Sequence, residues 1–375
     1  MIQKQDFLYK TERHMIPTPL PPSVELETKQ ILKKLIDAKS NLSQLKGLSH
    51  AIPNQKVLVN TLVLQEAKDS SEIENIITTY DDMFASQDSD DSQVFTTAAK
   101  EVRYYGDALQ TGYDALKKRS LLSRNDILAI QETLQHNQAG FRKLPGTALV
   151  NDRTKEVVYN PPDPQHIDAL MDNFLLYFND DSAWDLDPLI KMAVLHYQFE
   201  SIHPFYDGNG RTGRILNVLY LVKEGLLDFP IVYLSRFINV NKGRYYALLQ
   251  AVRDENTWEE WVLFILEGVA RTSLTSCKMV SEIRDAMQTY KHEIRSKYPK
   301  FYSQDLINNL FYYPYTKINY VSKELDTSYQ TARKYLELLT DDGLLEKRTI
   351  WRTSYYINKA LMTILYNAER DVLRL

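Results

Sequence analysis

Twelve consecutive residues at positions 203–214, HPFYDGNGRTGR, constrain this chain more than any other segment. They place His203 and Asp207 ahead of a Gly-Asn-Gly turn, directly after an apolar stretch long enough for a helix. Glycines on both sides of Asn209 permit the positive φ values of an anion-binding nest, and an apolar helix over 215–222 would point its N-terminal amides at the same place. The segment therefore predicts a phosphate-binding loop next to a helix N-terminus.

The side chains of this loop suit the transfer of a phosphate-containing group to a hydroxyl. Arg211 and Arg214 are three residues apart, so on a helix they share a face and can both reach a polyphosphate. Asp207 offers the hard oxygen ligand that Mg²⁺ takes when it bridges substrate phosphates. An ordinary histidine titrates near neutrality, so His203 could accept the proton of an attacking hydroxyl, while Phe205 is expected to anchor the loop in the core.

Each piece has a simpler interpretation when taken alone. A histidine after an apolar helix is commonly structural, a single Gly-Asn-Gly is commonly a turn, and arginines on one helix face are commonly solvated. The eight specified positions together, however, arise by chance on the order of once in 10¹⁰ windows at average residue usage. The joint pattern therefore favours a functional site.

At these residues the sequence resembles the Fic (Fic/Doc) family, whose signature H-x-F-x-[DE]-G-N-G-R-x-x-R it matches throughout. The resemblance implies a protein adenylyltransferase that moves AMP from ATP to a Ser, Thr or Tyr hydroxyl and releases pyrophosphate, with Mg²⁺ as cofactor. It implies that His203 is the general base and Asp207 the metal ligand. It also implies a set of nucleotide-binding residues: the phosphate cradle Gly208, Asn209 and Gly210, the phosphate ligands Arg211 and Arg214, and the nearby backbone of Thr212 and Gly213.

A second motif, at residues 70–75, has the arrangement [ST]-x-x-x-E-[GN] and resembles the inhibitory helix of Fic proteins that carry their own brake. Helical geometry places Ser70 and Glu74 on one face, and Asn75 completes the motif. The resemblance implies that Glu74 holds Arg214 in a buried, bidentate ion pair, so that Arg214 cannot orient the γ-phosphate.

Two other interpretations of the motif stay open. The run could instead be the capped start of a solvated helix, with Asp69 or Ser70 as the N-cap. Alternatively, Glu74 could position a water molecule that removes AMP from a modified protein, as the resemblance also allows.

Composition limits where such a protein could work. The chain has 375 residues, 44% of them hydrophobic, which suffices for two or three domains. Its net charge of -4 gives no general attraction to nucleic acid or to an anionic membrane. Residues 1–14 lack the apolar core of a leader, and no window approaches the roughly 18 apolar residues of a membrane span. Because Cys277 is the only cysteine, we expect a reducing compartment and a cytoplasmic protein.

The pattern along the chain predicts a mainly α-helical fold in four parts. These are an N-terminal helical region with the inhibitory motif (1–94), a Fic core (95–275), a linker helix (276–300) and a winged-helix domain (301–375). Apolar spacing predicts helices over 24–45, 57–80, 95–115 and 124–135, and the acidic, serine-rich run 86–93 is typical of a flexible connector.

Ahead of the signature, the β-prone runs 147–150 and 157–159 predict a hairpin. In Fic proteins a hairpin flap occupies this place, which implies that residues 147–160 hold a target segment by adding a strand. Asp187-Pro188 predicts the start of the helix that carries His203. Tyr246 lies where related sequences place an aromatic beside adenine, but Arg253 replaces a polar residue seven positions later, so the base remains open.

The last region predicts helices over 306–311, 321–325 and 329–339, followed by a hairpin formed by 346–349 and 354–357. It resembles a winged helix-turn-helix. Only Gln330, Arg333 and Lys334 stand out on the third helix, so a protein-contact or dimer-supporting module is favoured over DNA reading.

The leading hypothesis is thus a Mg²⁺-dependent protein adenylyltransferase that uses ATP, modifies protein hydroxyls including its own, and is restrained by Glu74. We also expect a homodimer. The alternatives are a nucleotide-sensing DNA-binding regulator and a Fic enzyme that transfers UMP, phosphocholine or phosphate.

Overall fold

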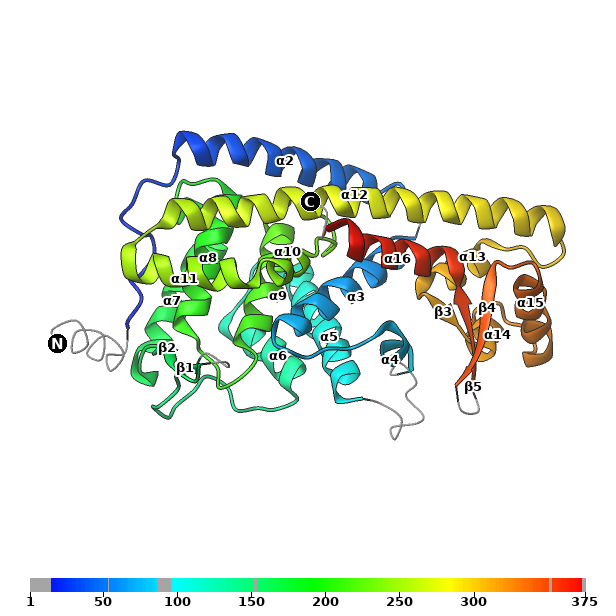
Figure 1. Cartoon of the computed structure of the whole chain (residues 1–375), viewed down its shortest axis with the longest axis horizontal. Coiled ribbons are helices and arrows are strands. Elements are labelled where there is room, and N and C mark those ends of the chain that lie inside the picture. The colour runs from blue at the N-terminus through cyan, green and yellow to red at the C-terminus, as the bar shows by residue number, and fades with distance from the viewer. Residues whose placement is uncertain (1–14, 53, 86–95, 151–153, 351–352, 373–375) are drawn as a thin grey trace. The chain divides into compact units, whose positions relative to one another are not determined.

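The computed structural model describes residues 15–52, 54–85, 96–150, 154–350 and 353–372 (Figure 1). It is mainly helical with small antiparallel sheets, as predicted. The expected connector 86–93, the turn at 151–153 and residues 1–14 lie outside the described residues. The chain divides into two compact units: the first comprises residues 1–36, 104–225 and 241–267, and the second comprises 37–103, 226–240 and 268–375.

The first unit is a helical assembly with one small hairpin. Three long helices contribute residues to both units: α2 (Lys29–Ser49), α5 (Thr97–Arg119) and α12 (Trp258–Lys297). The helices that belong to the first unit alone are α6 (Arg124–Gln135), α7 (Pro164–Asn179), α8 (Pro188–Ile202), α9 (Asn209–Lys223) and α11 (Lys242–Glu255), with a short 3₁₀ turn at Asp181–Ala183. The bounds of α6 agree with the helix predicted over 124–135.

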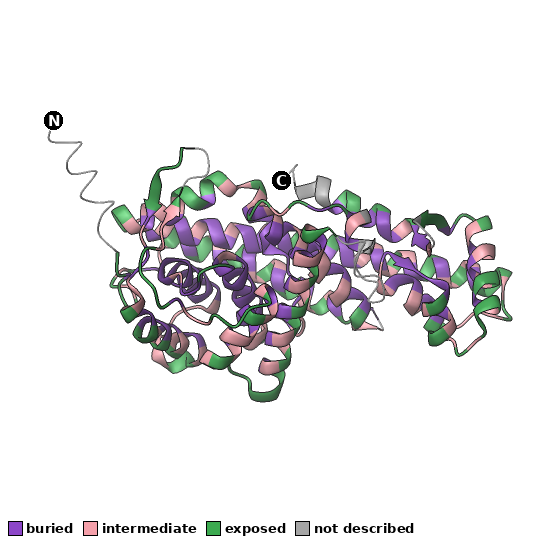
Figure 2. Ribbon diagram, turned by 90° about the horizontal axis from the view of Figure 1, so that it is seen from below, coloured by how far each residue is buried: buried purple, intermediate pink, exposed green. Residues whose placement is uncertain are grey.

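Helices α8 and α9 form the centre of the first unit. The side chain of Asp187 caps α8, accepting a hydrogen bond from the Leu189 amide at 3.0 Å, and Pro188 is the first helical residue, as predicted. From Leu189 to Ile202 every residue of α8 is buried, and buried residues (purple) line the inner helices in Figure 2. Such a helix is fixed by packing on all sides and gives a rigid mount for whatever follows its last residue.

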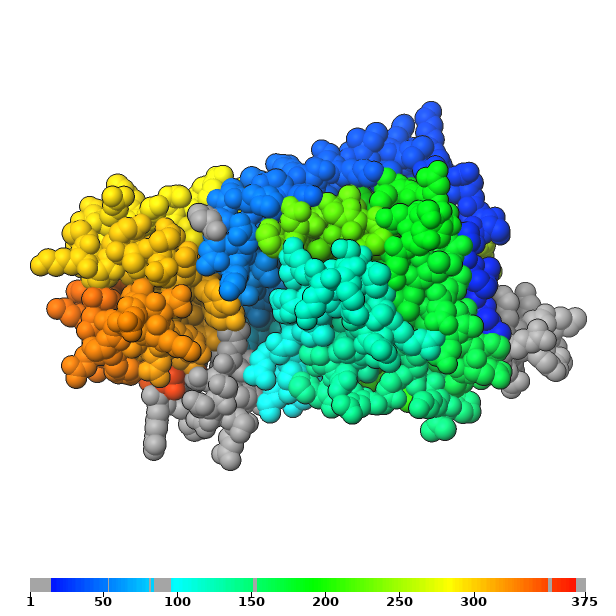
Figure 3. All heavy atoms as spheres, turned by 180° about the vertical axis from the view of Figure 1, so that it is seen from behind, coloured from blue at the N-terminus to red at the C-terminus, as the bar shows by residue number. Residues whose placement is uncertain are grey.

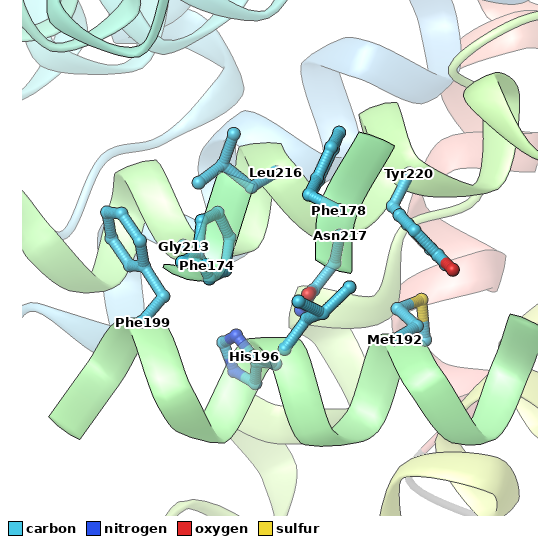
Figure 4. Close-up of a pocket in the computed structure, with 10 residues that line it drawn as sticks. Phe174, Phe178, Met192, His196, Phe199, Gly213, Leu216, Asn217 and Tyr220 are labelled. Atoms are coloured by element: carbon cyan, nitrogen blue, oxygen red, sulfur yellow. The ribbon is translucent and has the colours of Figure 1, made fainter. Parts of the chain in front are cut away.

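The two central helices pack closely because α9 has a glycine at the contact. A Cβ on Gly213 would lie 2.5 Å from Oε1 of Glu200 and 3.1 Å from a ring carbon of Phe199. Figure 4 shows Gly213 among the aromatic residues Phe174, Phe178 and Phe199. The cavity that they line measures only about 10 Å³, at the lower limit for one water molecule, so it is a packing defect and not a ligand site.

The predicted hairpin is confirmed as an antiparallel pair, β1 (Leu149–Val150) and β2 (Val157–Tyr159). Its base is tied to the end of α8, because the Tyr159 hydroxyl donates to the carbonyl of Ser201 at 2.7 Å. Burial raises the pKa of Tyr159 to about 12, so this hydroxyl keeps its proton at neutral pH.

The second unit contains α3 (Gln55–Ile73), α4 (Tyr80–Ala85) and α10 (Leu234–Val240). Helix α3 is held against α10 by buried polar contacts. Both the amide and the hydroxyl of Ser235 donate to the Glu66 carboxylate, and Nη1 of Arg236 lies 3.1 Å from Oδ1 of Asp69. Buried ion pairs add little net stability but restrict geometry, so these contacts fix the last turns of α3.

The C-terminal part of the second unit follows the predicted order of three helices and a hairpin. It consists of α13 (Gln304–Tyr312), β3 (Tyr315–Thr316), α14 (Ile318–Glu324), α15 (Tyr329–Asp341), β4 (Leu345–Ile350), β5 (Thr353–Asn358) and α16 (Lys359–Val372). The strands form one antiparallel sheet in the order β3-β5-β4. This order of helices and strands is the one that the sequence predicted for the region. Among the described residues, no helix combines the length and the apolar character needed to cross a membrane.

Candidate active site

The predicted catalytic histidine terminates the central helix. His203 is the C-cap of α8 and adopts a left-handed conformation with φ 49° and ψ 59°, its amide donating to the Phe199 carbonyl at 3.0 Å. This conformation turns the chain sharply out of the helix. The loop 204–208 then leads directly into α9, which begins at Asn209.

The loop is closed by one side chain. The Asn209 side chain accepts a hydrogen bond from the Phe205 amide and donates one to the Phe205 carbonyl, both at 2.8 Å. The Phe205 ring is fully buried and lies 5.2 Å from the Phe141 ring, as expected of an anchor in the core. The side chain of Asn209 therefore shapes the loop, while its backbone remains part of the helix N-terminus.

One expectation about the glycines and one about the start of α9 differ from the structure. Gly208 has φ +80° and supplies the left-handed turn, but Gly210 lies inside α9 and has no positive φ. Helix α9 starts six residues earlier than the apolar pattern suggested, so Gly210, Arg211, Thr212 and Gly213 lie in its first turns. The sequence pattern missed this start because polar signature residues precede the first apolar one. The helix N-terminus thus lies at the signature itself and directs its amides there.

Both signature arginines are buried: Arg211 is 4% and Arg214 2% exposed. Their positions on α9, three residues apart, place them on one side of the helix as predicted. His196 on α8 is a close neighbour of Arg214. Burial, and to a smaller degree the charge of Arg214, lowers the pKa of His196 to about 3, so this imidazole stays neutral at pH 7 and its Nε2 pairs with the Tyr245 hydroxyl at 2.9 Å.

Asp207 meets the requirements of a Mg²⁺ ligand that works with phosphate. Its side chain is exposed, and Oδ1 accepts a hydrogen bond from the Gly208 amide at 2.7 Å, which fixes the direction of the carboxylate. Among the described residues there is no cluster of three or more His, Cys, Asp or Glu that could enclose a metal ion. A single carboxylate fits Mg²⁺, which usually keeps water and substrate phosphates as its other ligands.

One residue that the sequence did not single out ties the site together. Arg142 is 2% exposed and its Nε donates to the carbonyl of His203 at 2.8 Å. Its Nη2 donates to the carbonyls of Pro162, just after the hairpin, and Ile202. The Arg142 guanidinium thus links the base of the hairpin to the end of α8 and the start of the signature loop. Local sequence gives no signal for this role, because the partners are main-chain carbonyls 20 to 61 residues away.

Tyr206 provides a second link that the sequence left unassigned. Its hydroxyl accepts hydrogen bonds from the amides of Lys143 and Leu144 at 2.8 and 3.1 Å. These two bonds hold the pKa of Tyr206 below its usual value, and the bond from the Lys143 amide has the larger effect. Tyr206, at a variable position of the signature, therefore fixes the segment that leads into the hairpin.

We expect Arg142→Ala to lower the free energy of unfolding by about 3 kcal/mol, because it leaves buried carbonyls without their charged donor. Thermal and urea unfolding would measure the change. The control is Arg124→Ala, which removes ion pairs to Asp168 and Asp172 at a largely exposed site and should cost less than about 1 kcal/mol. Equal losses for the two variants would contradict the role of Arg142.

The two adjacent tyrosines of α11 have different environments. Tyr245 is 1% exposed and serves as the partner of His196, whereas Tyr246 is 45% exposed and leaves its ring accessible. Arg253, on the same helix, lies over the Tyr159 ring with its guanidinium carbon 3.8 Å from the centroid. Arg253 therefore supports the hairpin, and Tyr246 remains the candidate for contact with a base.

The hairpin presents apolar side chains to its surroundings. Val150 is 45%, Val157 37% and Val158 49% exposed. At the end of β2, the Met15 amide donates to the carbonyl of Asn160 at 3.1 Å, so the described N-terminal segment already adds a backbone contact next to this strand. Exposed apolar strands with accessible backbone are suited to strand addition by a peptide.

Ser70, Glu74 and Asn75 belong to the second unit and lie at the C-terminal end of α3. The alternative of a capped helix start is wrong, because the helix ends at Ile73 and Glu74 is its C-cap. Asn75 has φ 62°, its amide donates to the Glu72 carbonyl, and the Ile76 amide donates to the Ser71 carbonyl, both at 3.0 Å. This is a Schellman motif, which explains why the motif requires Gly or Asn after the glutamate. Ser70 is fully buried, while Glu74 is exposed.

Comparison with known protein families gives three matches along the chain. Residues 32–114 match the Fic/DOC family N-terminal domain, residues 121–221 match the Fic/DOC family, and residues 286–361 match the C-terminal domain of SoFic-like protein adenylyltransferases. Together these matches cover more than half of the chain. The middle one includes the signature, and the first includes the motif at residues 70–75.

Curated relatives match over shorter segments. The chain is 29% identical over 167 residues to protein adenylyltransferase Fic of Aedes aegypti, covering 43% of this chain and 32% of that protein. It is 31% identical over 134 residues to protein adenylyltransferase fic-1 of Caenorhabditis elegans, covering 35% of this chain and 25% of that protein. The matches thus span about a third or less of these relatives.

Solved structures share the fold at low sequence identity. A Fic family protein from Desulfovibrio desulfuricans matches with a TM-score of 0.53 at 20% identity, covering 92% of this chain and 99% of that one. A Fic domain containing signaling protein from Bacteroides thetaiotaomicron matches with a TM-score of 0.54 at 19% identity, covering 66% of this chain and 97% of that one.

Proposed function

Because the chain belongs to the Fic/DOC family, we propose that it is a protein adenylyltransferase that moves AMP from ATP to the hydroxyl of a protein side chain. The observation that carries the proposal is the geometry of residues 203–214. A histidine at the end of a rigid helix, an exposed carboxylate and the N-terminus of α9 with two arginines all belong to one short loop. Relatives that carry the name protein adenylyltransferase support the reaction class.

The proposed reaction requires the protein to bind the triphosphate and to accept a proton from the acceptor. The amides at the start of α9, with Arg211 and Arg214, would bind the triphosphate and hold the α-phosphorus in line with the acceptor. His203 would take the proton of the acceptor hydroxyl as its oxygen attacks that phosphorus, and the bond to the leaving pyrophosphate would break. The backbone of Thr212 and Gly213, in the same first turns of α9, would contribute to binding the same phosphates.

Mg²⁺ would be held by Asp207 together with phosphate oxygens, and when bound it would neutralise the charge that develops on the leaving pyrophosphate. Asp207 suits this role because its carboxylate is exposed and is oriented by the hydrogen bond from the Gly208 amide. The Arg211 and Arg214 guanidinium groups would share this task, since both are buried and withdrawn from competing water.

The acceptor segment would bind along the flap, residues 147–160. Strand addition to the hairpin would fix the backbone of the segment, and the exposed valines would contact its side chains. Arg142 and Tyr159 connect the flap to the end of α8, so the position of the acceptor would be set relative to His203. The acceptors expected are Ser, Thr and Tyr, including residues of this protein.

We further propose that Glu74 restrains this activity by pairing with Arg214. Three observations support a fixed inhibitory group: the Schellman motif ends α3 directly at Glu74, Ser70 is fully buried, and Glu66 and Asp69 hold the helix on α10. Because Glu74 is exposed, the proposed pair would be only partly buried, which differs from the buried pair that the sequence suggested. The restraint should therefore be moderate.

We expect an adenylyl-sized mass increment on the protein after incubation with Mg²⁺ and ATP. Intact mass spectrometry would compare ATP, GTP, CTP, UTP and CDP-choline, because the phosphate grip depends on the backbone and arginines more than on the base. EDTA should abolish the increment. An increment with UTP or CDP-choline but not with ATP would assign a different transferred group, and no increment with any donor would overturn the proposal. The proposed homodimer can be measured on the same sample by light scattering.

A further inference from the structure

A groove outside the candidate active site contains a stack of aromatic rings. It has a volume of about 670 Å³ and lies in the second unit, between the C-terminal end of α12 with its following loop and one face of α15. The rings of Tyr298 and Phe301 have centroids 4.9 Å apart, and those of Phe301 and Tyr335 are 4.1 Å apart, with interplanar angles of 21° and 14°. Three nearly parallel rings thus follow one another along the groove wall.

Each ring is half-buried, so the stack is not sealed inside a core. The Tyr298 ring is held in place by the stack itself, and the nearby Asp342 carboxylate raises the pKa of its hydroxyl above the usual value. A fixed, accessible end of an aromatic stack offers a flat face on which another planar group can lie.

The groove is also positively charged. Lys297, Lys300 and Lys334 line it, all are exposed, and no acidic residue is in the lining. Lys297 is partly neutralised by Asp342 at 3.4 Å and by Glu293 at 4.0 Å. Within the part of the chain that the structure describes, neither Lys300 nor Lys334 lies within ion-pair distance of a carboxylate, so both charges face the solvent.

The surrounding domain departs from the charge of the whole chain. Residues 286–361 carry twelve lysines and arginines against eight acidic residues, although the full chain has net charge -4. Figure 3 shows the end of α12 (yellow) and α15 (orange) next to each other on one face of the molecule. On α15 alone the sequence shows few basic residues, which argues against nucleic-acid binding. It does not show that the lysines and aromatic rings between α12 and α13 lie on the same surface as α15.

We propose that this groove binds single-stranded nucleic acid, with the lysines on backbone phosphates and a base stacked on the end of the ring series. An acidic peptide would satisfy the lysines but leave the aromatic faces without a planar partner. A duplex would present phosphates but keep its bases paired and stacked internally. Basic groups interleaved with stacked aromatic rings are what single strands require, since every base has a face that can stack.

The test is fluorescence anisotropy of the full chain with a labelled oligothymidylate of twelve nucleotides, at 50 and 200 mM KCl. If three lysines contact phosphates, affinity should fall about 20-fold between these salt concentrations. A duplex of the same length and a poly-glutamate peptide are measured in parallel, and both are expected to bind more weakly than the single strand.

Variants separate the two contacts. The double variant Lys300→Ala, Lys334→Ala should lose affinity and reduce the salt dependence to about threefold, as for one remaining phosphate contact. Its control, Lys323→Ala, removes an exposed lysine of α14 outside the groove. Tyr298→Leu should weaken binding by about 5- to 150-fold, the contribution of one stacked base. Its control is Tyr329→Leu, which removes a 52% exposed tyrosine of α15 that does not line the groove.

Circular dichroism melting of each variant shows whether the domain remains folded. The proposal is overturned if the single strand does not bind at 50 mM KCl, or if the double variant binds it as the unmodified protein does. Tighter binding of the duplex would assign the surface to groove reading by α15, and equal binding of poly-glutamate would assign it to an acidic protein partner.

Discussion

Replacing His203 by alanine is expected to lower the rate of AMP transfer by about 10² to 10⁴-fold, the usual contribution of a general base. The phosphate-binding elements should remain, because the amides of α9 and the two arginines do not depend on the imidazole. The measurement is the initial rate of self-modification by intact mass at saturating ATP, together with ATP affinity by calorimetry. The rate should collapse while ATP binding is retained.

Two controls distinguish lost chemistry from lost structure. His292→Ala removes an exposed histidine of α12 and should leave the rate unchanged. Added imidazole should partly restore transfer by His203→Ala, because a free base can enter the space that the side chain vacated. His203 also serves as the left-handed C-cap of α8, so a fall in melting temperature without rescue by imidazole would show that the residue acts only in the fold.

Local patterns predicted the elements whose signals lie within a few residues. The proline at the start of α8, both ends of α6 and the β-prone runs of the hairpin depend on near neighbours in the chain, and the structure contains these elements as expected. The helices and wing of the C-terminal domain followed for the same reason. The burial of Phe205 was also predictable, since an aromatic in a polar loop requires a core to enter.

Other features depend on contacts that the sequence does not display. The Arg142 side chain stabilises carbonyls that are distant along the chain, and no pattern near position 142 indicates them. The side chain of Asn209 looked like part of a phosphate cradle but is used to close the loop on Phe205. The start of α9 was placed too late because periodicity detects apolar faces, and the first turns of this helix are polar yet buried. Where a binding motif forms the first turn of a helix, apolar periodicity therefore places the start of the helix too late.

The motif at residues 70–75 illustrates how geometry narrows an interpretation. A Ser-rich, acidic run is typical of a helix N-terminus, yet here it is the last turn of α3. Asn75 explains the difference, because a left-handed residue after the helix favours Gly or Asn and stops the helix directly after Glu74. A carboxylate at that position is also unfavourable for the helix dipole, so its presence favours a role other than helix stability.

We expect Glu74→Gln to increase the initial rate of AMP transfer by about 5- to 150-fold, the range of typical coupling energies. The neutral amide keeps the size of the side chain but cannot form the proposed ion pair, so Arg214 would be free to bind the γ-phosphate. Glu74→Gly should give at least the same increase. The apparent affinity for ATP should rise together with the rate, because the carboxylate and the phosphate compete for one guanidinium.

The matched control is Glu72→Gln on the same helix turn, which breaks a half-exposed pair with Lys68 at 3.7 Å. It should leave transfer unchanged, since this carboxylate is not part of the motif. Similar rates for Glu74→Gln, Glu72→Gln and the unmodified chain would remove the restraint from the proposed mechanism. The reaction class would still be decided separately by His203→Ala.

The same variants decide between restraint and AMP removal by Glu74. If Glu74 positions a water molecule for removal, Glu74→Gln should leave the initial rate of transfer unchanged and raise only the final level of modification. Purified, AMP-modified protein provides the direct measurement. If Glu74 removes AMP, the protein that retains Glu74 would release AMP with Mg²⁺ and without ATP, and the Glu74→Gln variant would not. A carboxylate that only competes with phosphate for Arg214 predicts the reverse, with a faster initial rate in the variant and no release of AMP from either protein.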